Sequence, residues 1–192
     1  KENWDGINWV AFPIIKITRY NNEAETDPHY SDEVYGITIH ELAHTAHVLT
    51  MNNVIDFYNV NNQIVESWAT AVQWYLTNKE YRARGIANYG NETYYVPDLR
   101  RPHLYAYQYW EMSDDPEYTS LFINLADNFN EMNVLFDYYG FGSVNDQVAG
   151  YNLSNIQSQF LKNCYAKSSL TTYLKAYKPT GVSNTQIDLL LS

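Results

Sequence analysis

The clearest alternation of apolar and polar positions lies between residues 63 and 84. Apolar side chains recur there at the spacing of one helix face, namely Ile64, Val65, Trp68, Ala69 and Val72. A polar stripe runs beside them, formed by Glu66, Thr70 and Gln73. Asn62 can cap the start of this segment and Gly85 can stop its end. We therefore predict a helix from about Gln63 to Arg84.

An earlier helix is predicted from Ser31 to about Met51. Ser31 can cap it, and two acidic side chains follow in its first turn, where the helix dipole favours negative charge. Asparagines at positions 52 and 53 end the helix. Residues 54–60 are then expected to be a short linker between the two helices.

A strand is predicted between Trp9 and Arg19, where β-branched and apolar residues dominate. Pro13 lies inside this run, and proline cannot donate a backbone hydrogen bond to a neighbouring strand. The strand is therefore expected at a sheet edge, or broken at Pro13.

The second half of the chain predicts further helices. Residues 86–103 have the composition of a loop, and periodicity leaves residues 103–112 open between helix and strand. A helix is expected from Asp115-Pro116 to about Asn130, because proline is favoured at the first helical position. Two capping boxes, Ser154 to Gln157 and Ser183 to Gln186, are expected to open the last helical segments.

Composition and charge limit the kinds of molecule that the protein is expected to bind. The formal net charge is −10, and the only basic clusters are two arginine pairs, which argues against nucleic acid. The 19 tyrosines and five tryptophans suit a wet groove that holds a polymeric ligand. No apolar run approaches the roughly 18 residues needed to span a membrane. Cys164, the single cysteine, lies in an apolar helical pattern and is predicted to be buried.

Candidate chemistry lies in the segment HELAH at residues 40–44. Residues four apart in a helix are rotated by only about 40°, so His40 and His44 can direct two nitrogens at one zinc ion. Glu41 is rotated by about 100° from His40. It therefore flanks the metal, where a carboxylate can take a proton from a zinc-bound water.

The third ligand must come from elsewhere in the chain. His47 lies about 10 Å along an unbroken helix from His40, too far to share an ion, so we expect it beside the site. Glu66, 22 positions beyond His44, lies on the polar stripe of the next predicted helix and is the favoured ligand. Asp56, in the linker, is the alternative.

The pattern HExxH followed by Glu66 resembles the gluzincin group of zinc metallopeptidases, although Val65 stands where that group usually has asparagine. The resemblance covers about residues 10–84. It implies that His40, His44 and Glu66 hold Zn²⁺ and that Glu41 is the general base. It also implies a donor to the reaction's oxyanion from the C-terminal part, for which His103 and Tyr107 are the candidates.

These observations predict a mostly helical α+β protein with a zincin-like fold, whose HExxH helix packs on a small or incomplete N-terminal sheet. We expect one catalytic domain, residues 1–192, with a zinc-binding lobe (1–85) and a helical C-terminal lobe (86–192). It would form the C-terminal portion of a longer, extracytoplasmic chain, secreted or surface-anchored. The expected activity is zinc-dependent hydrolysis of peptides or proteins, glycosylated substrates included. The alternative is a non-catalytic, zinc-containing module that binds glycan or protein.

Overall fold

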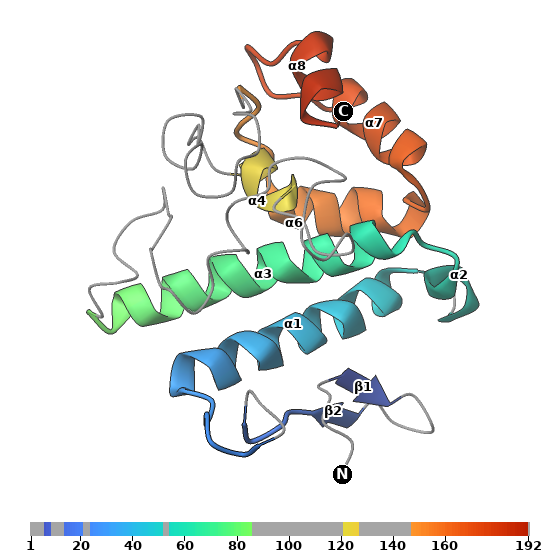
Figure 1. Ribbon diagram of the computed structural model, residues 1–192. Helices are drawn as coiled ribbons and strands as arrows, with labels where there is room; N and C mark the ends of the chain where they lie inside the picture. Colours follow the sequence, from blue (N-terminus) through green and yellow to red (C-terminus); the bar gives the residue numbers. More distant parts are fainter. Residues whose placement is uncertain are drawn as a thin grey trace.

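The chain is mostly helical in the parts that the structure describes. The computed structural model describes residues 6–8, 14–20, 24–51, 54–85, 121–126 and 147–191. Figure 1 shows these elements in successive layers: a small β-hairpin, helix α1, helix α3, and then the shorter helices of the C-terminal part. The predicted helical content is confirmed.

The described strands form a hairpin of two short segments. Strand β1 (Gly6–Asn8) pairs antiparallel with β2 (Ile14–Lys16), with Ile7 opposite Ile15. The predicted strand up to Arg19 is therefore too long at its C-terminal end, and its first part, residues 9–13, lies outside the described residues. The hairpin lies beside α1, on the side that faces away from α3 (Figure 1).

Helix α1 (Ser31–Thr50) matches its predicted range, but its start is capped differently. Tyr30 occupies the capping position, and the Glu33 carboxylate accepts a hydrogen bond from the Tyr30 backbone N–H at 2.7 Å. This bond is the carboxylate half of a capping box, in which the side chain of the third helical residue accepts from the backbone N–H of the cap residue. Ser31 is accordingly the first helical residue and not the cap.

Helix α3 (Asn62–Ala83) returns antiparallel to α1 after a short connection (Figure 1). The cap is Asn61, whose side-chain oxygen accepts from the Gln63 backbone N–H at 2.8 Å, so the predicted cap at Asn62 is one residue late. Gly85 follows the helix with a φ of 73°, as expected of a glycine stop. The expected linker contains a short helix, α2 (Val54–Tyr58).

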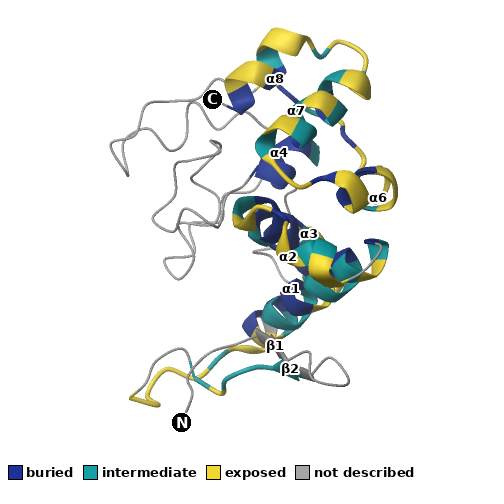
Figure 2. Cartoon of the chain, turned by 90° about the vertical axis from the view of Figure 1, so that its right-hand side faces the viewer, coloured by how far each residue is buried: buried dark blue, intermediate teal, exposed yellow. Residues whose placement is uncertain are grey.

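The apolar core lies on the side of α3 that faces away from α1. There α3 packs against α4 (Leu121–Ala126), which Figure 2 shows as almost wholly buried. Helix α4 lies inside the helix expected over residues 115–130, whose other residues are outside the described ranges. Trp68 meets Phe122 edge to face, with ring centroids 5.6 Å apart. Cys164 is fully buried in the same core, and burial raises the pKa of its thiol to about 12, which confirms a packing role.

The C-terminal helices complete this core. They are α6 (Leu153–Asn155), a π-helical turn (Ile156–Phe160), a 3₁₀ turn (Leu161–Asn163), α7 (Lys167–Ala176) and α8 (Asn184–Leu190). The capping box at Ser183 and Gln186 is confirmed, with reciprocal hydrogen bonds of 3.2 and 2.7 Å. The predicted box at Ser154 is wrong, because Asn152 caps the helix earlier by accepting from the Asn155 N–H.

Candidate metal centre

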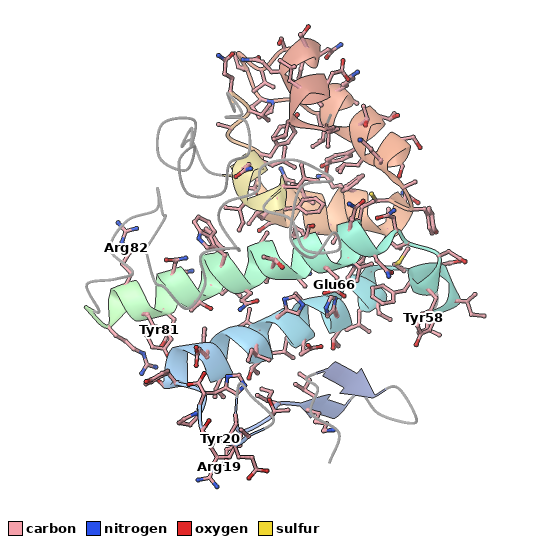
Figure 3. All side chains as sticks on the ribbon, in the orientation of Figure 1. Arg19, Tyr20, Tyr58, Glu66, Tyr81 and Arg82 are labelled. Atoms are coloured by element: carbon pink, nitrogen blue, oxygen red, sulfur yellow. The ribbon has the colours of Figure 1, made fainter. Side chains whose placement is uncertain are left out.

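Two neighbouring helices bring three metal-binding side chains together. His40 and His44 project from the same face of α1, with ring centroids 4.7 Å apart, and Glu66 projects from α3. Figure 3 shows Glu66 in the space between the two helices. The Glu66 Oε2 atom lies 3.1 Å from His40 Nε2 and 3.3 Å from His44 Nε2. Within the described residues, these three form a group that can hold a metal ion.

These separations fit a small tetrahedral ion. Two ligand atoms that each lie about 2.1 Å from one tetrahedral zinc are about 3.4 Å apart. The observed Oε2–Nε2 distances of 3.1 and 3.3 Å are close to that value, and all three candidate ligand atoms lie within 4.8 Å of one another. Two imidazole nitrogens and one carboxylate oxygen are also a donor set that zinc prefers.

The hydrogen bonding of His40 supports a cation at this point. Its Nδ1 atom lies 3.1 Å from Gln73 Oε1, and an amide oxygen only accepts, so Nδ1 carries the hydrogen. The other ring nitrogen, Nε2, faces the Glu66 carboxylate at 3.1 Å. Two electron-rich atoms at 3.1 Å repel each other unless a proton or a metal ion lies between them.

Glu66 is ionised at neutral pH. Burial alone would raise its pKa, but hydrogen bonds and positive charge from His40 and His44 outweigh burial and lower the pKa from 4.5 to about 2. The site therefore offers a carboxylate, which is the form that binds a metal.

Glu41 follows His40 in α1 and is mostly buried, with 8% of its surface exposed. A carboxylate at this depth, one residue from a ligand, is sheltered from bulk water while staying on the helix that carries both histidines. The role of Glu41 as general base stays a prediction.

His47 lies outside the converging group, in agreement with its expected position beside the site. It is fully buried and meets Phe57 of α2 edge to face, with ring centroids 5.2 Å apart. Burial and the nearby charge of His44 outweigh the Leu161 backbone and lower the pKa of His47 from 6.5 to about 4. His47 therefore packs as a neutral ring between α1 and its neighbours.

The other candidates differ in where the structure places them. Asp56, the alternative third ligand, lies in α2 and is not among the grouped side chains. His103 and Tyr107, the candidate oxyanion donors, lie outside the described residues.

Sequence reasoning did not assign a role to Gln73. The sequence does indicate that Gln73 shares a helix face with Glu66, because it lies seven positions later, or two turns, on the predicted polar stripe. The pattern could not show that this stripe would face His40 instead of solvent.

Comparison of the chain with family models, with curated proteins and with solved structures found no match. The resemblance to gluzincins therefore stays a prediction that rests on the motif and on the geometry of the site. In the described part of the chain, no helix is long and apolar enough to cross a membrane.

Proposed function

We propose that this protein is a zinc-dependent peptidase related to the gluzincins. The observation that carries the proposal is the convergence of His40, His44 and Glu66 from two helices, with Glu41 next to the first ligand. A helix with the HExxH motif beside a small antiparallel hairpin supports a reduced, zincin-like fold.

In this proposal His40, His44 and Glu66 would hold the zinc ion. Zinc bound there would supply a more acidic water and would polarise a substrate carbonyl. The Glu41 carboxylate accepts the proton of the attacking water and delivers it to the leaving amine. Glu66 would bind the metal as a carboxylate, the form in which this side chain is a metal ligand.

The proposed substrates are peptides or proteins, glycosylated ones included, in an extracytoplasmic compartment. The net charge of −10 disfavours polyanionic substrates, and the abundance of tyrosine suits contacts along an extended chain.

The deciding experiment compares the wild type with Glu41→Gln on a diverse peptide library. Glutamine keeps the shape of the side chain but cannot accept the proton, so hydrolysis should fall by about 10²- to 10⁴-fold. Zinc content and peptide binding should be unchanged, because Glu41 is not a ligand.

A wild-type protein that binds zinc fully but cleaves no peptide would contradict the peptidase proposal. The alternative, a non-catalytic module that binds glycan or protein, would then explain the aromatic composition better.

A further inference from the structure

The helix pair that carries the metal ligands also contains a contact between Gln73 and His40 (Nδ1–Oε1, 3.1 Å). Gln73 lies on α3, 33 positions from His40 in the sequence, so the bond joins the two helices. It fixes the hydrogen of His40 on Nδ1 and directs Nε2 at Glu66 Oε2, 3.1 Å away. His44 differs, because its Nδ1 atom is buried without a hydrogen-bond partner among the described residues.

Gly36 makes room for this contact. It lies in α1, one turn before His40, on a helix where glycine costs about 1 kcal/mol relative to alanine. A Cβ atom at this position would lie 3.0 Å from Gln73 Nε2 and 3.5 Å from Gln73 Cγ. An alanine would therefore push the Gln73 amide away by a few tenths of an ångström. Gly36 is therefore unfavourable for α1 itself, but its missing side chain lets the Gln73 amide of α3 approach.

We infer that Gly36 and Gln73 together position His40 for metal binding, with Gln73 as the hydrogen-bond acceptor and Gly36 as the gap that admits it. This inference rests on the metal centre of the proposed function, but it concerns zinc affinity and not hydrolysis. It means that the zinc affinity depends on two residues, Gly36 and Gln73, that are neither metal ligands nor the general base.

The test measures zinc affinity by competition with a chromophoric chelator at fixed pH and salt. Gln73→Leu removes the acceptor and should lower the affinity by about 10- to 100-fold. Gln73→Glu keeps an oxygen acceptor and should restore it to near the wild-type value. Gln159→Leu, the same substitution at an exposed position, is the control and should leave the affinity unchanged.

Gly36→Ala separates positioning from general stability. Alanine favours the helix, so the metal-free protein should be at least as stable as the wild type, while zinc affinity falls several-fold. In a Gln73→Ala background, Gly36→Ala should have no further effect on affinity, because no amide remains to be displaced. Absorption spectra of the cobalt-substituted proteins should show altered bands for Gly36→Ala and Gln73→Leu, and wild-type bands for Gln73→Glu.

The outcomes distinguish this inference from the proposed function. Unchanged zinc affinity in Gln73→Leu, or equal losses in Gln73→Leu and Gln73→Glu, would overturn the inference and leave the peptidase proposal standing. Zinc binding with the predicted order of affinities but without hydrolysis would support the inference and overturn the peptidase. A wild-type chain that binds no zinc would overturn both.

Discussion

Glu66 is the residue whose role depends most on where α3 places it. Its Oε2 atom meets both histidines, while Asp56, closer to them in sequence, belongs to the neighbouring helix α2 and stays outside the group. Proximity along the chain was thus a poor guide to the third member of this group, and position on the polar stripe of the next helix was a good one.

Glu66→Ala should abolish stoichiometric zinc binding, because only two imidazoles would remain of the three protein ligands that a catalytic zinc site uses. Asp56→Ala is the matched control and should leave the metal content unchanged. Metal analysis of both purified variants checks this. The opposite result would assign the third ligand to Asp56.

His47 should make the stability of the metal-free protein depend on pH. The folded chain binds no proton at His47 until the pH falls to about 4, whereas the unfolded chain binds one below about 6.5. Stability is therefore complete above pH 6.5 and is lost as the pH falls towards 4, by up to about 3 kcal/mol.

His47→Leu should flatten this dependence. The measurement is the free energy of unfolding in denaturant, with a chelator present, for both proteins between pH 4 and 7. Equal slopes in the two proteins would show that His47 is not buried as a neutral ring.

Helix α3 has two functions on two faces. One face carries Glu66 and Gln73 towards α1, and the other packs Trp68 and its apolar neighbours against α4. A helix held by its apolar face keeps its polar face at a constant distance from α1, which is what a metal site with short bonds requires.

Trp68→Ala should test which face carries the stability. Trp68 is 1% exposed, and its removal should lower the free energy of unfolding by about 3–5 kcal/mol. Tyr75→Ala, an aromatic substitution on the same helix at a residue that is 50% exposed, should change it by about 0.5 kcal/mol or less. Similar losses in denaturant unfolding would contradict this orientation of α3.

For the whole molecule, the candidate metal site joins α1 to α3 across their interface. His40 and Glu66 lie 26 positions apart, and the core of α3 with the C-terminal helices lies on the far side of the site. A bound ion would connect the layer of α1 to that core.

Zinc should therefore stabilise the protein against heat. Saturation at about 100 times the dissociation constant contributes about 3 kcal/mol, which raises the unfolding temperature by several degrees. Calorimetry with and without a chelator measures the effect, and Glu66→Ala should show little of it. An unfolding temperature that zinc does not change in the wild type would argue against a metal bound by the folded state.

Local rules of helix and turn formation were enough to predict several features of this protein. The ranges of α1 and α3, the shared face of His40 and His44 and the stop at Gly85 all follow from helical period and backbone preference within a few residues. Local rules placed the caps wrongly at Ser31, Asn62 and Ser154. Asn61 and Asn152 can cap as well as the residues chosen, while the cap position of α1 falls on Tyr30, whose backbone N–H donates to Glu33. The pairing of β1 with β2 also escaped them, because a strand is defined by its partner as well as by its own residues.

The arrangement of the candidate metal site, in contrast, is decided by the packing of α3 on α1. That Glu66 and not Asp56 arrives at the histidines depends on the path of the connection and on the apolar face that holds α3. The contact of Gln73 with His40 depends on the space left at Gly36, a property of two surfaces together. The spacing of residues along one helix is set by the backbone, which sequence patterns report directly. The distance between two helices is set by every side chain at their interface, and no segment of the sequence contains that information alone.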